Sequence, residues 1–394
     1  MQPSTRMRPF LGLAVLIGTV LAGGAVARVQ DQCGPFTDVS PAFCPYVLEM
    51  FYLGITAGTS PTTYSPDNPV TRGQAAVFVS KGVNQSIGRS SRRAALGQWW
   101  TTTPHWADDL GVTDVGILPH FVACDGADVW VQKINTVDRV RASDGKLLET
   151  WTGLVNGSGV VSAMGRVFVP GDTNPAAPHG GTNTGVLYMI DPSQPAGAVT
   201  TVATGLSPGS HGIAFDGDRL WVTNFSGISI VTPGSTTPWP AVNVTTGFST
   251  PLGIVFDGSS MWVTDPVAGS VFRLDANGAI VQTVQTGTPG FPVFDGENIW
   301  VPRVDSVYVL RAATGEIIAT PTGNGLTNAY VAGFDGQRIA ITNLQTDTIS
   351  LFRAADASPI GSFSTGTGSQ PIGVVSDGLN FWVALSGVGR LARF

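Results

Sequence analysis

Short apolar segments separated by turn residues follow one another along the chain from residue 106 to its end. The clearest example runs from His211 to Phe225, where the apolar residues Ile213 to Phe215 meet Asp216-Gly217 and a second apolar segment ends in Trp221-Val222. Asp-Gly favours a tight hairpin, because glycine adopts positive φ freely and aspartate tolerates it. This stretch therefore predicts two short strands joined by a turn.

The same unit recurs with a period near 40 residues. Its turn positions are Asp125, Met164, Asp216, Asp257, Asp295, Asp335 and Asp377, with spacings of 39, 52, 41, 38, 40 and 42 residues. Further strands are indicated after each pair, such as Val271 to Leu274 and Ile280 to Thr286. Four strands per unit of this length are typical of a β-propeller. We predict a mainly β fold, a seven-bladed propeller over residues 106–394.

The last repeat is one strand short. After Trp382-Val383 the chain holds only one further strand segment, Gly389 to Phe394. The segment Asp108 to Gly116 precedes the first repeat as Val242 to Gly247 precedes the fourth. We therefore predict that a strand near residues 107–115 completes the last blade and removes an exposed sheet edge.

The N-terminal pattern differs from the repeats. Arg6 and Arg8 precede an apolar stretch from Phe10 to Leu21, and Ala25-Val-Ala27 provides a small-residue cleavage site. These features predict a signal peptide over residues 1–27, and an uncleaved anchor is the alternative. The stretch is short for a membrane span and no later segment is long and apolar enough, so we expect no transmembrane span after cleavage and a secreted or cell-envelope location.

Residues 28–84 follow a helical pattern. Apolar residues at helical spacing predict a helix from Pro45 to Gly54, and Thr71 with Gln74 forms a capping box for a second helix. Export permits disulfides, so we expect a bond between Cys33 and Cys44. Cys124 lies on a repeat strand and is expected to be a buried free thiol. Residues 85–105, with a short basic run, read as a linker.

Several short motifs within residues 28–84 resemble one S-layer homology motif. They are Phe36-Thr-Asp-Val39, Leu53-Gly-Ile-Thr-Ala-Gly58, Tyr64-Ser-Pro-Asp-Asn-Pro69 and Thr71-Arg-Gly-Gln74. The family usually carries three such motifs and binds cell-wall polysaccharide, and this chain shows one. The resemblance implies that Thr71 and Arg72 contact the sugar. The alternative is that Thr71 only caps the helix and Arg72 is a solvated charge.

Composition narrows the partners further. The chain of 394 residues has a formal net charge of −6, only 12% charged residues and no large basic patch, which argues against a nucleic-acid partner. Its hydrophobic content of 43% is that of a folded protein.

Candidate chemistry gathers on one predicted face of the propeller, where the loops after the second strands meet the entries to the first strands. His120 and His211 stand five residues before their turn aspartates, and His179 lies in the long loop from Pro170 to Gly185. The polar candidates on this rim are Asp172, Asn224, Asp265, Arg303 and Asn343. Imidazoles with a carboxylate suit a divalent metal or a general base, so His120, His179, His211 and Asp172 are candidate ligands for Mg²⁺ or Ca²⁺. The alternative is that each histidine only packs at the rim.

The Gly-Ile-x-x-Asp-Gly-x-x-x-Trp pattern from Gly212 to Trp221 resembles extracellular propellers of the YVTN, lactonase-like and virginiamycin B lyase type. That set includes enzymes and proteins without known chemistry, so two hypotheses stand. In the first, the propeller is a platform for a protein or small-molecule ligand and the N-terminal segment attaches it to the wall. In the second, the chain is a metal-dependent lyase or lactonase-type hydrolase that uses His211 and His179 as catalytic residues.

Overall fold

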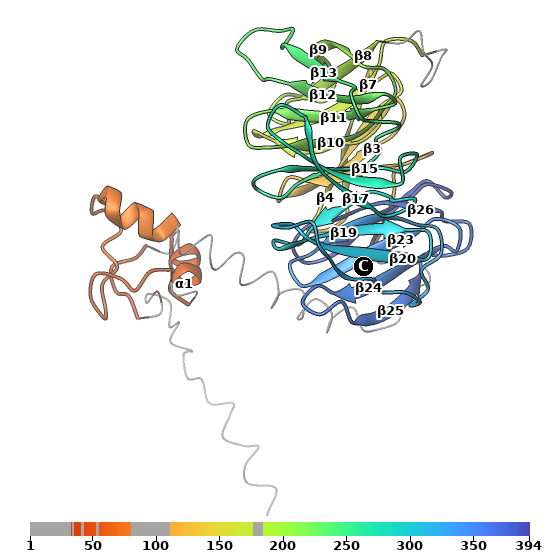
Figure 1. Ribbon diagram of the computed structural model, residues 1–394. Helices are drawn as coiled ribbons and strands as arrows, with labels where there is room; N and C mark the ends of the chain where they lie inside the picture. Colours follow the sequence, from red (N-terminus) through yellow and green to blue (C-terminus); the bar gives the residue numbers. More distant parts are fainter. Residues whose placement is uncertain (1–32, 34, 41–42, 53–54, 80–110, 176–183) are drawn as a thin grey trace, which may run out of the picture. The chain divides into compact units, whose positions relative to one another are not determined.

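The computed structural model describes residues 33, 35–40, 43–52, 55–79, 111–175 and 184–394. The chain divides into two compact units, Met1–Ser86 and Ile87–Phe394, each of which is described by itself (Figure 1). The predicted signal peptide, the predicted linker and His179 lie outside the described residues. No helix in the described part of the chain is long and apolar enough to cross a membrane.

The N-terminal unit contains helix α1 (Cys44–Tyr52) and a helical segment over residues 72–79, both where the sequence predicts helices. Its small core is built on Phe36, which is 1% exposed. The rings of Phe51 and Tyr64 pack edge-on against Phe36 at centroid distances of 5.1 and 5.4 Å. Gly58 has φ +78°, and a Cβ there would lie 2.5 Å from the Phe36 ring, so the core requires glycine at this position.

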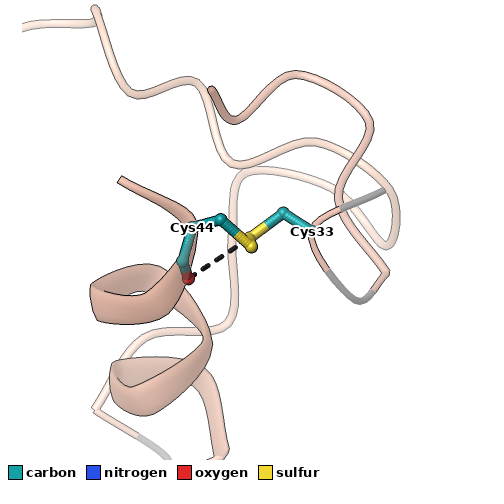
Figure 2. Close-up of a disulfide and its surroundings, with 2 residues drawn as sticks. All are labelled: Cys33 and Cys44. Carbon is teal, nitrogen blue, oxygen red and sulfur yellow. Dashed lines mark hydrogen bonds between the residues drawn. A yellow bond between two sulfur atoms is a disulfide. The ribbon is translucent and has the colours of Figure 1, made fainter. Parts of the chain in front are cut away.

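Two connections hold this unit together. Cys33 and Cys44 form a disulfide with their Cα atoms 5.3 Å apart (Figure 2), which ties the start of the unit to the first turn of α1. The carboxylate of Asp38 accepts hydrogen bonds from the backbone N–H groups of Tyr64 (2.8 Å) and Ser65 (2.7 Å). The bond from Tyr64 is the main reason that the pKa of Asp38 is lowered.

The C-terminal unit is a seven-bladed β-propeller of four-stranded antiparallel sheets, as predicted (Figure 1). Blade 1 contains β2 (Val122–Cys124), β3 (Asp128–Gln132), β4 (Thr136–Arg141) and β5 (Leu147–Thr152). Blade 2 contains β6 (Val161–Ala163), β7 (Arg166–Asp172), β8 (Gly185–Ile190) and β9 (Thr200–Leu206). Blade 3 contains β10 (Ser210–Phe215), β11 (Leu220–Asn224), β12 (Gly227–Val231) and β13 (Ala241–Val244).

The remaining blades repeat this order. Blade 4 contains β14 (Ile254–Phe256), β15 (Met261–Asp265), β16 (Ser270–Leu274) and β17 (Ile280–Gln285). Blade 5 contains β18 (Val293–Phe294), β19 (Asn298–Arg303), β20 (Ser306–Arg311) and β21 (Ile317–Ala319). Blade 6 contains β22 (Ala329–Phe334), β23 (Arg338–Asn343), β24 (Thr348–Arg353) and β25 (Pro359–Ser364).

Blade 7 closes the ring with strands from both ends of the unit. It contains β26 (Pro371–Ser376), β27 (Phe381–Leu385), β28 (Arg390–Arg393) and, as its outer strand, β1 (Val112–Asp114). Residues Val112, Thr113 and Asp114 pair with Ala392, Leu391 and Arg390 in an antiparallel register. The outer edge of the last sheet is therefore covered by a strand that precedes the first blade.

The first strand of each blade lies nearest the central axis. First strands of neighbouring blades contact one another around the whole ring, and the Gly373 N–H donates to the carbonyl of His120 at 2.8 Å where blade 7 meets blade 1. A Cβ on Gly212 would lie 2.9 Å from the carbonyl oxygen of Leu252. The glycine at the start of this repeat thus allows two backbones to approach closely.

Burial is greatest in the second strands and decreases towards the outer edge, whereas first strands such as β14 and β18 include half-buried residues. The second strands β11, β15 and β27 are buried at every residue, whereas the fourth strand β17 alternates between half-buried and exposed residues. Strands covered on both faces by neighbouring blades read as continuous apolar runs, and a strand at the outer edge keeps the polar alternation. This gradient explains why the Trp-Val segments are the most apolar part of each repeat.

The repeated aspartates build the blades. Indole N–H groups donate to aspartate Oδ2 at 2.7–2.8 Å in five pairs: Trp130–Asp125, Trp221–Asp216, Trp262–Asp257, Trp300–Asp295 and Trp382–Asp377. The other oxygen of each aspartate accepts two backbone N–H groups of the turn, as Asp257 does from Ser259 and Ser260 at 2.7 Å. These carboxylates are therefore engaged by the turns that the sequence predicts.

Candidate functional site

The polar rim residues predicted from the sequence all terminate second strands. Asp172 ends β7, Asn224 ends β11, Asp265 ends β15, Arg303 ends β19 and Asn343 ends β23. Because the second strands of all blades run in the same direction, these residues lie on one face of the propeller. We call it the loop side, and the opposite face, which carries the turns between first and second strands, the turn side.

Two of these residues are held by their own blades. Asp265 is fully buried and accepts hydrogen bonds from the backbone N–H groups of Ser249 (2.7 Å), Thr250 (3.0 Å) and Ala268 (2.9 Å). Asn343 is also fully buried; its amide donates to Ser350 Oγ at 2.9 Å and accepts from the backbone N–H of Thr327 at 3.3 Å. Both side chains organise the entry to their blade.

Arg303 is half-buried on blade 5. Its guanidinium lies over the ring of Tyr308, 5.4 Å from the centroid, and Nη1 donates to Ser306 Oγ at 3.4 Å. The buried Nε has no hydrogen-bond partner among the described atoms. A cation held in this way on an aromatic ring retains donor capacity for an anionic or carbonyl group of a ligand.

His211 stands at the inner entry to blade 3. Its Nδ1 lies 3.0 Å from the carbonyl oxygen of Pro251, at the entry to blade 4, and its ring packs edge-on against Phe225 with centroids 5.0 Å apart. A carbonyl can only accept, so Nδ1 carries the proton in the neutral imidazole and Nε2 is the basic nitrogen. The Pro251 carbonyl therefore orients the His211 ring at the border of the channel.

His120 occupies the equivalent position in blade 1, and blade 2 separates it from His211. Its backbone N–H donates to the Gln132 carbonyl of its own blade at 2.9 Å, and its carbonyl accepts from the Gly373 N–H of blade 7 at 2.8 Å. No group of three or more His, Cys, Asp or Glu side chains in the described ranges is arranged to hold a metal ion. The predicted metal set with His179 stays a prediction, because residues 176–183 lie outside those ranges.

Aromatic rings from three blades meet at the axis. The Phe121 ring of blade 1 lies 4.8 Å from the Phe291 ring of blade 5, and Phe291 packs edge-on against Tyr330 of blade 6 at 5.3 Å. Burial raises the pKa of Tyr330. Blades 1 and 5 are not neighbours in the ring, so these side chains fill the channel from opposite sides.

This aromatic cluster is a feature that sequence reasoning missed. Phe121 and Phe291 stand four residues before their turn aspartates, at the position that Gly212 occupies in blade 3. A large residue in a place where other copies have glycine is the signal that could have located it. The cluster confines any ligand on the loop side to the mouth of the channel.

The loop side also exposes apolar side chains around its rim. Five loops that follow second strands each present one: Ile134 (36% exposed), Phe225 (37%), Val267 (70%), Val304 (50%) and Val388 (44%). Ile117 and Leu118, at the entry to blade 1, add to them with 83% and 43% exposure. On the turn side, among the described first-to-second turns, Met164 is the exposed large apolar residue.

A groove of about 650 Å³ lies on the turn side between blades 5 and 6. Its polar lining includes Asp295, which is bound to the Trp300 indole, and Arg338, whose Nε donates to Asp335 at 2.6 Å. Because the fold uses these groups, the groove is a weaker candidate site than the loop side.

In the N-terminal unit, Thr71 and Gln74 form the predicted capping box. The Gln74 N–H donates to Thr71 Oγ1 at 3.2 Å, and the Thr71 N–H donates to Gln74 Oε1 at 2.9 Å. Thr71 is thus engaged as the helix cap, whereas the Arg72 side chain is exposed at the first helical position.

Comparison with known proteins supports the assignment of the N-terminal unit to a known domain family and of the C-terminal unit to the propeller fold. Residues 35–76 match the S-layer homology domain family, so the chain carries one such domain ahead of its propeller. No curated protein matches the sequence.

Solved structures match the propeller. A streptogramin B lyase is 17% identical with a TM-score of 0.53, and the match covers 72% of this chain and 97% of that one. Catalytically inactive virginiamycin B lyase from Staphylococcus aureus with quinupristin is 16% identical with a TM-score of 0.57, covering 73% and 97%. Hydrazine synthase from Kuenenia stuttgartiensis is 15% identical with a TM-score of 0.57, and the match covers 73% of this chain and 97% of that one. These likenesses establish the fold.

Proposed function

We propose that this protein is exported and held at the cell envelope by its S-layer homology domain, and that the loop side of the propeller binds a ligand with apolar groups. The observation that carries the second part is a recurrence: five loops that follow second strands each expose an apolar side chain, such as Val267 and Phe225, whereas Met164 is the one large apolar residue exposed in the described first-to-second turns. Exposed apolar groups that gather on one face mark a binding surface.

Wall attachment rests on the S-layer homology match to residues 35–76 and on the position of Arg72. The capping box fixes the start of the helix, and Arg72 projects from that start as an exposed, permanently charged donor. Cell-wall polymers that carry phosphate or carboxylate groups would suit a guanidinium. Thr71 then serves as the cap that orients Arg72 and makes no contact of its own.

The test of this part is co-sedimentation of the full chain with purified cell walls. Arg72→Ala is expected to weaken binding at least about tenfold, since a charge-assisted hydrogen bond contributes roughly 1.5–3 kcal/mol. Arg353→Ala, an exposed arginine on the outer part of blade 6, is the charge-matched control and should bind as the parent does. Equal binding by the parent and the Arg72 variant removes Arg72 from the contact.

The ligand-binding part is tested with an apolar fluorescent probe, anilinonaphthalene sulfonate, titrated into the full chain. Val267→Asp combined with Val304→Asp should reduce probe binding, because both side chains are exposed on the loop side. Val242→Asp combined with Val281→Asp changes two exposed valines on fourth strands and is the matched control. Equal loss in both pairs would show that the probe reports general surface apolarity, and the loop side would lose its special status.

A second function, metal-dependent lyase or lactonase-type hydrolase, is favoured by one observation. The Pro251 carbonyl holds the His211 imidazole in a single tautomer, which is the arrangement of a general base. The assay is ring opening of cyclic esters, quinupristin among them, with Mg²⁺ or Ca²⁺ present. Activity that disappears in His211→Ala supports this function; activity that persists in that variant excludes His211 as the catalytic base.

A further inference from the structure

Three buried side-chain oxygen atoms in the seam between blades 2 and 3 have no hydrogen-bond partner among the described atoms. Asp172, Ser210 and Asn224 are 0%, 1% and 0% exposed. Asp172 Oδ2, Ser210 Oγ and Asn224 Oδ1 are each buried and have no hydrogen-bond partner among the described atoms. Buried polar atoms are almost always paired, so three in one place require an explanation.

The strand register places the three side chains in the same seam. Ser210 and Asn224 are direct partners across β10 and β11, so their side chains share one sheet face. Asn224 alternates with Val222 and Leu220, which pack against Phe168 and Leu187 of blade 2. Asp172 alternates with Phe168 on β7 and therefore faces blade 3.

One hydrogen bond crosses the seam beside these residues. The backbone N–H of Gly209 lies 3.4 Å from Asp172 Oδ1, and Ser210 is the next residue. The Asn224 amide is oriented by its own blade, because Nδ2 donates to the Val222 carbonyl at 3.1 Å and to Ser229 Oγ at 2.9 Å. Oδ1 is therefore the atom that faces away from those groups.

Blade 6 supplies an internal comparison. Asn343 occupies the same place as Asn224 and donates to Ser350 as Asn224 donates to Ser229, but its Oδ1 accepts from the backbone N–H of Thr327. Thr327 stands eight residues before Asp335; the residue eight before Asp216 is Pro208, which has no N–H. The residue paired with Asn343 is Ala329, where blade 3 has Ser210. Blade 3 thus lacks the internal donor and gains a hydroxyl.

We propose that the seam between blades 2 and 3 binds a hard cation, Ca²⁺, through Asp172, Ser210 and Asn224. A buried carboxylate is costly without a compensating charge, and no ion pair of the described residues involves Asp172. Carboxylate, amide and hydroxyl oxygens are the ligands that Ca²⁺ takes, with backbone carbonyls or buried water completing its shell. Mg²⁺ holds its own waters and fits a closed, fully buried seam less well.

This site shares Asp172 with the metal set predicted from the sequence but uses none of its histidines. His211 is directed to the Pro251 carbonyl of blade 4, whereas Ser210, one residue earlier, faces blade 2. The cation would fasten the end of β7 to the entry of β10 and stabilise the loop side. With a single carboxylate, affinity is expected on the order of 0.1–1 mM, as in extracellular Ca²⁺ sites.

The test combines calorimetric titration with thermal unfolding of the full chain after treatment with a chelator. Ca²⁺ at about 10 mM should raise the melting temperature, and Mg²⁺ and Na⁺ at equal ionic strength should raise it less. Asp172→Asn should abolish the Ca²⁺-dependent shift. Asn224→Asp, which adds a second charge, should tighten binding about tenfold.

Asn343→Asp is the matched control, because it changes the equivalent residue of blade 6, and it should leave the Ca²⁺ response unchanged. A Ca²⁺ shift that survives in Asp172→Asn, or the absence of any shift in the parent, overturns the proposal. Parent protein without a cation response, together with stabilisation by Asp172→Asn, would identify water as the only occupant of the seam. An equal response to Na⁺ and Ca²⁺ would contradict the assignment to Ca²⁺.

Discussion

The hydrogen bond between Asp257 and Trp262 gives the sharpest prediction about stability. In Asp257→Asn the turn keeps an oxygen that accepts from the Ser259 and Ser260 N–H groups, but the amide nitrogen replaces the oxygen that accepts from the indole at 2.8 Å. The new amide N–H group in Asp257→Asn and the indole N–H of Trp262 are then two donors that face each other. Because Trp262 is 0% exposed, bulk water does not replace the lost acceptor. Leaving a buried donor opposite a lost charged acceptor costs about 2–3 kcal/mol.

The assay is a double-mutant cycle in thermal and urea unfolding. Asp257→Asn is expected to lower the melting temperature of the propeller by about 4–6 °C, at about 2 °C per kcal/mol for a domain of this size. Trp262→Phe removes the donor and retains a ring, and in that background Asp257→Asn should cost about 1–2 kcal/mol less, because the pair is already broken. Asp218→Asn, at an exposed turn position of blade 3, is the control and should shift stability by less than about 0.5 kcal/mol. Equal effects of Asp257→Asn in both backgrounds would refute the reasoning.

Three further predictions concern pH, thiol chemistry and the axis. Burial opposes ionisation of Asp257, yet hydrogen bonds from Trp262 and the turn outweigh it and lower the pKa of this carboxyl. The stabilisation by ionised Asp257 is therefore complete above the unfolded pKa of about 3.9 and is lost as pH falls through the lower folded value. The urea midpoint should be flat from about pH 5 to 7 and fall below about pH 4, and a midpoint that rises on acidification would contradict this. Burial, with nearby carboxylates, raises the pKa of the thiol of Cys124, the free cysteine. Cys124 should therefore react with a thiol reagent at pH 8 much more slowly than glutathione does, and reaction at the glutathione rate would argue against a raised pKa. Gly212→Ala places a Cβ 2.9 Å from a carbonyl of blade 4 and should destabilise the propeller by about 1–3 kcal/mol, measured by urea unfolding, whereas Gly234→Ala, whose Cβ would meet atoms at 3.7 Å or more, should change it little.

The period and the turn chemistry explain why the fold could be predicted from the sequence. Asp-Gly followed by a buried Trp-Val recurs at nearly constant spacing, and each copy satisfies its own hydrogen bonds locally. The indole bond was not predicted, although a fixed spacing of five residues between Asp216 and Trp221, and in four other copies, is its sequence signal. The closing strand was accessible for a similar reason, since a missing fourth strand at the end leaves an unpaired edge.

The site was harder to predict because contacts between blades decide it. Asp265 and Asn343 read as rim candidates, yet backbone N–H groups of their own entries engage them. Asp172 and Asn224 are rim candidates by the same sequence argument. Pro208, however, has no N–H to donate to Asn224, and the side chains of Asp172 and Asn224 share a seam between blades. Asp172 lies 38 residues before Ser210 and 52 before Asn224 in the sequence, and no local pattern encodes their meeting. The pairing of Phe121 with Phe291 across the axis is also a contact between blades, and only the replacement of the repeat glycine by phenylalanine marks its place in the sequence.

The central claim is that residues 28–84 hold the protein at the cell envelope. The most direct measurement is the dissociation constant for purified cell walls of the chain that begins at Arg28, compared with a chain that lacks residues 28–84 and with the N-terminal unit joined to an unrelated carrier protein. We expect the chain that begins at Arg28 and the carrier fusion to sediment with the walls, and the chain that lacks residues 28–84 to remain in the supernatant. If the chains with and without residues 28–84 sediment equally and the carrier fusion does not sediment, wall binding belongs to the propeller. That result would contradict attachment through the N-terminal unit.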